Sequence, residues 1–138
     1  MISYHEIDIK TTILSKRKTS KWIKQIASRY DKIIGNINFI FCTDEKIIEL
    51  NQKYLKHNYY TDIITFDYSE NNIIAGDIFI SMDTVHSNAE KFNEPFIREI
   101  YRVMIHGILH LCGIQDKSAS QRLAMRESEN EALNFFFQ

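Results

Sequence analysis

The hydrophobic and polar positions of this chain follow two different periods, and the changes of period mark strands and helices in turn. Four segments are apolar or rich in β-formers and predict strands: 2–9, 37–42, 61–68 and 73–81. The polar loop at 69–72 is long enough to join the last two strands as a hairpin. Gly35-Asn36 predicts a break in the chain just before the second strand.

Between these strands, and from the last strand to the end of the sequence, apolar residues recur at helical spacing. We expect the first helix to start at Thr19 or Ser20 and the second at Thr43, because these side chains can cap a helix. A short helix is expected over 82–92, and a longer apolar helix follows Pro95 and continues through residue 111. Ser118 with Gln121 resembles a capping box for the last helix, which is expected to face the core through Ala124, Met125, Ala132, Phe135 and Phe136.

This alternation predicts an α/β or α+β layer fold with one mixed sheet. The length of 138 residues and the hydrophobic content of 44% suit one globular domain over residues 1–138. One proline and four glycines are too sparse to mark a linker between domains. We therefore expect all candidate chemistry to lie on a single body.

The composition indicates the cellular compartment of the protein more clearly than it indicates a binding partner. The two isolated cysteines, Cys42 and Cys112, suggest a reducing compartment rather than a disulfide framework. The first residues show no signal-peptide pattern, and no apolar run approaches the roughly 18 residues that span a bilayer, so we expect a cytoplasmic protein without a membrane partner. A net charge of −1 neither requires nor excludes nucleic acid.

The strongest candidate chemistry is a pair of histidines, His106 and His110, in the long apolar helix. Residues four apart lie on one helix face, so the two imidazoles are placed to hold one metal ion. Gly113 can turn the chain back, and Asp116 can then supply a third ligand. Three ligands and an open position are typical of a catalytic metal site, whereas core or surface histidines are the alternative. Cys112 lies in the same motif, but we interpret it as a small buried hydrophobe rather than a ligand.

Gly107 excludes one class of metalloenzyme. Zinc proteases with an H-E-x-x-H motif carry their general-base glutamate directly after the first histidine, and that position is Gly107 here. Glycine also lowers helix propensity by about 1 kcal/mol relative to alanine. A close-packed neighbour that leaves no room for a side chain would explain its presence.

The residues around the histidine pair carry a wider resemblance. The motif His106-Gly107-x-Leu109-His110-Leu111-x-Gly113 is similar to the signature of the YbeY family. Three further segments match that family in order and spacing over roughly residues 37–133: Leu50-Asn51-Gln52-Lys53-Tyr54, Thr61-Asp62-Ile63-Ile64-Thr65-Phe66 and Gly76-Asp77-Ile78.

The resemblance implies a single-strand-specific, metal-dependent endoribonuclease with one Zn²⁺ per chain and no nucleotide cofactor. It implies roles in 16S rRNA 3′-end maturation and ribosome quality control, with the small ribosomal subunit and its assembly factors as partners. The implied fold is a single zincin-like α/β (α+β) domain with a mixed four-stranded sheet and about five flanking helices.

Two positions depart from the family pattern. Family members usually carry a third histidine where this chain has Asp116, and a carboxylate there adds negative charge that should make the metal a weaker Lewis acid. Family members often carry an arginine at the position of Leu55, and leucine cannot hold a phosphate. Lys56 or His57 can take that role, although a solvated loop is the alternative for both.

Further candidates are weaker. Asp77 can orient a ligand histidine or simply satisfy a strand end, and His86 can approach the site or serve only the structure. Tyr59 and Tyr60 can stack on unpaired bases or pack under their loop. A basic cluster at the start of the first helix can follow a phosphate backbone or form a solvated face: Lys16, Arg17, Lys18, Lys21 and Lys24.

Three functions remain open from the residues. The first is a zinc endoribonuclease that acts on rRNA. The second is a metal-stabilised ribosome-assembly or RNA-binding factor that does not cleave. The third is a zinc hydrolase of small molecules or peptides, which fits the ligand set but lacks the glutamate base.

Overall fold

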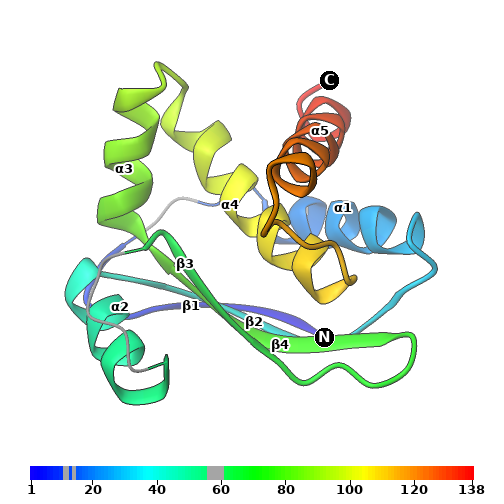
Figure 1. Cartoon of the computed structure of the whole chain (residues 1–138), viewed down its shortest axis with the longest axis horizontal. Coiled ribbons are helices and arrows are strands. Elements are labelled where there is room, and N and C mark those ends of the chain that lie inside the picture. The colour runs from blue at the N-terminus through cyan, green and yellow to red at the C-terminus, as the bar shows by residue number, and fades with distance from the viewer. Residues whose placement is uncertain (11–12, 14, 56–60) are drawn as a thin grey trace.

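The computed structural model describes residues 1–10, 13, 15–55 and 61–138 and contains one four-stranded sheet (Figure 1). The strands are β1 (Ile2–Glu6), β2 (Ile33–Cys42), β3 (Ile63–Asp67) and β4 (Ile73–Ser81), in the spatial order β1-β2-β4-β3. β1 and β4 both run parallel to β2, whereas β3 pairs antiparallel with β4. The sheet is therefore mixed, as predicted, and β3 is an edge strand.

The described residues form five α-helices beside the sheet. They are α1 (Lys16–Ser28), α2 (Asp44–Leu50), α3 (Met82–Lys91), α4 (Phe96–Leu111) and α5 (Ala119–Phe136), and a π-helical turn, η1 (Asn51–Leu55), continues α2. Figure 1 shows α2 on one side of the sheet and α1, α3, α4 and α5 on the other. This arrangement confirms the predicted α+β fold with a four-stranded mixed sheet and about five helices.

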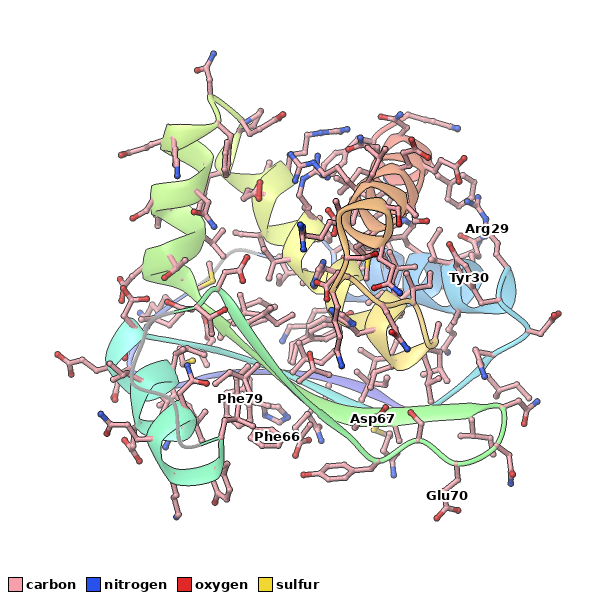
Figure 2. All side chains as sticks on the ribbon, in the orientation of Figure 1. Arg29, Tyr30, Phe66, Asp67, Glu70 and Phe79 are labelled. Carbon is pink, nitrogen blue, oxygen red and sulfur yellow. The ribbon has the colours of Figure 1, made fainter. Side chains whose placement is uncertain are left out.

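The two faces of the sheet bury cores of different size. Alternate residues of β4, such as Ile78 and Ile80, join the large core that α1, α4 and α5 complete. Phe79 points to the opposite face and packs with Phe66 beside the smaller core under α2, as Figure 2 shows. Because successive strand residues alternate between faces, a residue's position in β4 decides which core or site it can reach.

Several local predictions are confirmed by capping geometry. Thr43 caps α2 by accepting a hydrogen bond from the backbone N–H of Lys46, and Ser118 and Gln121 form the predicted capping box of α5. The 69–72 loop joins β3 and β4 as an antiparallel pair. The described part of the chain contains no helix with the length and apolar character needed to cross a membrane.

Three local predictions were wrong. α1 starts at Lys16 and is capped by Ser15, because the hydroxyl of Thr19 is buried and hydrogen-bonded to Tyr101. Gly35-Asn36 does not end the strand: β2 begins at Ile33 and passes this dipeptide with an irregularity between Ile34 and Ile37. On α5, Met125, Ala132 and Phe136 are buried as expected, but Ala124 and Phe135 face solvent.

Candidate metal centre

Helix α4 brings the two histidines to the edge of the large core. Most of the helix is buried, whereas His106 and His110 are half-buried at its C-terminal end. Gly113 follows with a φ of +98°, a left-handed conformation that glycine adopts without strain. The chain turns back there, with the backbone N–H of Ile114 donating to the carbonyl of Leu109 at 3.1 Å. This turn places Asp116 beside the histidines.

The three side chains converge as the spacing predicted. The Oδ2 atom of Asp116 lies 3.2 Å from Nε2 of His110 and 3.4 Å from Nε2 of His106. One candidate ligand atom from each residue lies within 4.8 Å of the others. Two imidazole nitrogens and one carboxylate oxygen match the ligand set of a zinc site that keeps an open position. The residues present therefore fit a metal ion.

A carboxylate that the sequence reasoning missed, Glu129 of α5, holds the first histidine. Nδ1 of His106 donates a hydrogen bond of 2.6 Å to Oε2 of Glu129, whose side chain is 6% exposed. This bond leaves Nε2 directed toward Asp116, so Glu129 holds the ring of His106 in the orientation that a metal-binding histidine would need. Burial lowers the pKa of His106, but Glu129, Asp62 and Asp116 outweigh burial and raise it above its ordinary value of 6.5.

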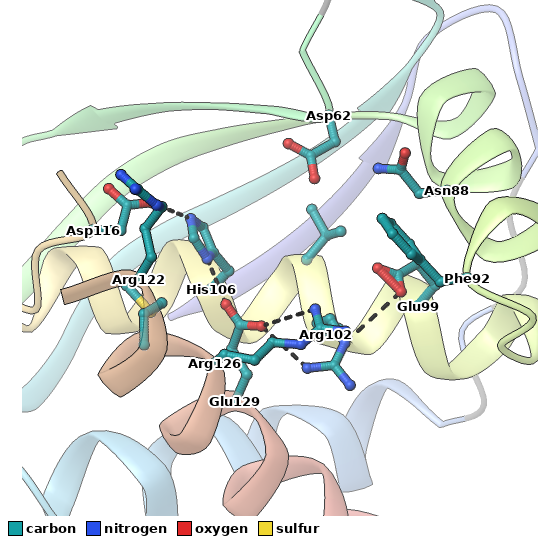
Figure 3. Close-up of a pocket in the computed structure, with 12 residues that line it drawn as sticks. Asp62, Asn88, Phe92, Glu99, Arg102, His106, Asp116, Arg122, Arg126 and Glu129 are labelled. Atoms are coloured by element: carbon teal, nitrogen blue, oxygen red, sulfur yellow. Dashed lines mark hydrogen bonds and ion pairs between the residues drawn. The ribbon is translucent and has the colours of Figure 1, made fainter. Parts of the chain in front are cut away.

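Glu129 also belongs to a buried ion network (Figure 3). Its Oε1 atom accepts a hydrogen bond of 3.1 Å from Nη1 of Arg102. Nε of Arg102 and Oε2 of Glu99 face each other at 3.8 Å, and both atoms are buried without a hydrogen bond. Burial raises the pKa of Glu99 despite the nearby Arg102. The network fixes Glu129 from the side opposite His106.

Within the described parts of the chain, two hollows adjoin the cluster of His106, His110 and Asp116. The first, of about 240 Å³, lies between α3, α4 and α5, and its lining includes His106, Asp116 and Asp62 (Figure 3). Burial raises the pKa of Asp62, although His106 partly opposes that shift. The second hollow, of about 350 Å³, lies beside the edge strand and is lined by Ile63, Thr65, Asp67, His110 and Leu111. The cluster can therefore be approached from two sides.

Packing explains Gly107. A Cβ atom at this position would lie 3.1 Å from methyl carbons of Ile63 and Ile78. That is closer than ordinary van der Waals contact, so the sheet leaves no space for the glutamate of a zinc protease. The structure agrees with the close-packing explanation and places no general base at residue 107.

Asp77 does not reach the histidines. It lies on the α2 face of the sheet, where it lines a different hollow with Phe66 and Phe79. Its Oδ1 accepts a hydrogen bond of 3.0 Å from the side chain of Asn38. The prediction that Asp77 orients a ligand was therefore wrong, because the alternation of the strand points it away from α4; Glu129 takes that position.

The structure also shows where the other described weak candidates lie relative to the two hollows. The ring of His86 stacks on Phe96 at 3.6 Å and lines neither hollow, which agrees with a structural role. Cys112 is half-buried against the core, and burial raises its pKa to about 11, as expected of a small hydrophobe. Leu55 is 44% exposed. Lys56, His57, Tyr59 and Tyr60 lie outside the described residues.

The predicted basic cluster is exposed on α1, but it lies apart from the metal ligands. None of its five members, Lys16, Arg17, Lys18, Lys21 and Lys24, lines either hollow. The cations that do line the first hollow are Arg102, Arg122 and Arg126. A signal for Glu129 was present in the sequence: it falls on the apolar stripe that Met125, Ala132 and Phe136 form along α5.

The fold and the cluster define a small α+β protein with an accessible group of two histidines and one carboxylate that could hold a metal ion. Comparison with known proteins shows the family to which the chain belongs. The family model described as Endoribonuclease YbeY matches residues 4–136, and the chain belongs to this family.

Relatives match over nearly the whole chain. Endoribonuclease YbeY of Phocaeicola vulgatus is 56% identical over 133 residues, which is 96% of each chain. The protein of the same name from Bacteroides thetaiotaomicron is 52% identical over 96% of each chain. Among solved structures, the solution structure of TM1509 from Thermotoga maritima matches with a TM-score of 0.66 and 25% identity, covering 99% of this chain and 89% of that one.

Proposed function

We propose that this chain is a zinc-dependent endoribonuclease that cleaves single-stranded RNA and processes ribosomal RNA. The observation that carries the proposal is the convergence of His106, His110 and Asp116 between two open hollows. The relatives named Endoribonuclease YbeY support RNA as the substrate. Within that function we propose maturation of the 16S rRNA 3′ end and ribosome quality control, as the family resemblance implies.

The residues present suit zinc better than a hard cation. Two imidazoles and one carboxylate are typical zinc ligands, whereas Mg²⁺ and Ca²⁺ prefer oxygen ligands throughout. When bound, a zinc ion supplies a Lewis acid that can polarise a phosphoryl oxygen and neutralise charge that develops on it.

The surrounding side chains prepare the site. Glu129 holds the ring of His106 in one orientation, and Arg102 holds Glu129. Asp62 lines the same hollow as His106, and its raised pKa makes it the candidate group to exchange a proton with the substrate. Gly107 occupies the position of the general-base glutamate in H-E-x-x-H zinc proteases, and the absence of that carboxylate at this position disfavours a peptide substrate.

One assay separates cleavage from binding. The purified protein is incubated with single-stranded and double-stranded RNA, with and without chelator, beside His110→Ala. We expect cleavage of the single strand that chelator and His110→Ala both abolish. His86→Ala is the matched control, because it removes an exposed imidazole that lines neither hollow.

Each result has a defined reading. Activity that survives in His110→Ala marks a contaminating nuclease. Clean protein that binds RNA and never cuts it supports the assembly-factor alternative. Metal analysis of the same sample should find about one equivalent of zinc per chain, and protein without bound metal would contradict the proposed site. Ribosomal partners, a cytoplasmic location and the single-domain boundaries stay predictions.

A further inference from the structure

Two arginines of α5 face the candidate metal centre. Arg122 and Arg126 lie four residues apart, one helical turn, and both line the hollow that contains His106 and Asp116 (Figure 3). They are cations that sequence reasoning did not associate with the site. Their position on the same wall allows both to meet one extended ligand.

The buried ion network does not use all the hydrogen-bond donors of either guanidinium group. Arg126 is 45% exposed and lies 3.8 Å from Glu129, whose oxygens already accept hydrogen bonds from His106 and Arg102. Arg122 donates through Nη1 to the carbonyl of Lys117 at 2.7 Å. It forms no ion pair with a carboxylate within the described parts of the chain. Both groups therefore keep donors for a ligand.

The charges around the hollow select the kind of ligand. Among the described residues, four carboxylates line it, those of Asp62, Glu99, Asp116 and Glu129, against three guanidinium groups. A divalent cation at the histidines shifts the total to net positive, and Arg102 stays paired with Glu99 and Glu129. The positive charge left at the accessible wall is then that of Arg122 and Arg126, which suits an anion.

The second hollow has the opposite character. Among the described residues, its lining contains Asp67 and no arginine or lysine. Asp67 would repel a phosphate there, whereas it would not repel an uncharged base or ribose. The two sides of the metal centre thus differ in the part of a nucleotide that each can accept.

We propose that Arg122 and Arg126 form a phosphate-binding subsite that positions the RNA backbone on the α5 side of the metal centre. The planar guanidinium group offers paired N–H donors that match two phosphate oxygens. The subsite rests on the proposed function for its ligand, RNA. It also predicts how a nucleotide lies across the site, with a phosphate on the α5 side and a nucleoside on the β3 side.

Binding, rather than cleavage, tests the subsite. The zinc-loaded protein is titrated against a fluorescent, single-stranded 2′-O-methyl oligoribonucleotide, and anisotropy is followed at several salt concentrations. The test variant combines Arg122→Gln and Arg126→Gln. Arg29→Gln is the matched control, because it removes one exposed guanidinium at the far end of α1 (Figure 2). A comparison variant combines Lys21→Gln and Lys24→Gln in the basic cluster of α1.

We expect the double arginine variant to bind about 10-fold more weakly, the scale of a lost hydrogen bond to a charged group. The slope of log affinity against log salt should fall by about 0.7 for each phosphate that the variant no longer neutralises. A variant with Arg122→Lys and Arg126→Lys should retain most of the salt slope but not the full affinity, because lysine keeps charge and lacks the paired donors.

Three results would overturn the assignment. The first is wild-type affinity and salt slope in the double arginine variant. The second is a loss of affinity confined to the α1 variant. The third is loss of zinc or of the folded state in the double arginine variant, since the arginines would then maintain the site rather than bind RNA. A wild-type protein that binds through these arginines and never cuts RNA would refute the proposed function and leave the subsite standing.

Discussion

Replacing Glu129 with glutamine should weaken zinc binding without removing a zinc ligand. Glu129 accepts a 2.6 Å hydrogen bond from Nδ1 of His106, and its side chain is 6% exposed. Glutamine has nearly the same shape but no negative charge, and it can turn either an oxygen or an amide group toward the imidazole. The substitution therefore tests the orienting charge while the proposed ligands His106, His110 and Asp116 stay in place.

Two magnitudes follow from the contacts. Loss of a carboxylate that orients a ligand histidine costs about 10–100-fold in metal affinity, or about 1.4–2.7 kcal/mol. Arg102 also loses its 3.1 Å carboxylate partner and retains Glu99 at 3.8 Å. Truncating one member of a buried ion pair costs about 3–5 kcal/mol, but the glutamine oxygen can still accept one bond, so we expect about 1–3 kcal/mol from the stability of the metal-free protein.

Zinc affinity is measured by competition with a chromophoric chelator, and stability by urea unfolding of the metal-free protein. Glu131→Gln is the matched control, because it removes an exposed carboxylate from the same helix. Unchanged zinc affinity in Glu129→Gln would refute the orienting role. A lower stability with unchanged zinc affinity would show that Glu129 serves only the ion network.

Three further predictions concern stability. Gly107→Ala should destabilise the fold by about 1 kcal/mol in urea unfolding, because overpacking against Ile63 and Ile78 outweighs the gain in helix propensity; a more stable variant would contradict this. Ser118→Ala should cost about 1 kcal/mol in the same measurement by removing the capping box of α5, and an unchanged midpoint would argue against it. The pKa of His106 in the folded protein is raised, since Glu129 outweighs the lowering effect of burial, so its charged form stabilises the metal-free fold below the unfolded pKa of about 6.5. This contribution should be lost as the pH rises through the folded pKa, and a melting temperature of Glu129→Gln that falls over the same range as steeply as that of the wild type would count against it.

The elements that sequence analysis placed correctly have local causes. The cap at Thr43 and the capping box at Ser118 involve residues three apart, and the β3–β4 hairpin is set by a short polar loop. The start of α1 was misplaced because Thr19 bonds to Tyr101, which is 82 residues away in sequence. A hydroxyl that can cap a helix was instead buried by tertiary packing, which local propensity does not encode.

The same distinction between local and tertiary causes applies to the residues of the candidate site. The convergence of His106, His110 and Asp116 could be predicted because one helix and one glycine turn set their spacing. Glu129 lies on another helix, 23 residues beyond His106, so only its place on an apolar stripe could have marked it. Asp77 was chosen for its residue type and neighbouring motif, but strand alternation directs it to the other face.

The contacts of His106 predict that protonation of its Nε2 atom and metal binding at that atom compete. Nδ1 donates to Glu129, so Nε2 has a lone pair unless the ring is charged. Nε2 lies 3.4 Å from an oxygen of Asp116, and two acceptor atoms at that distance repel each other unless a proton or a cation lies between them. In the metal-free protein a proton on Nε2 can satisfy both, which agrees with the raised pKa of His106. Zinc at the proposed site would require the same lone pair, so we expect its binding to release that proton and to strengthen as the pH rises.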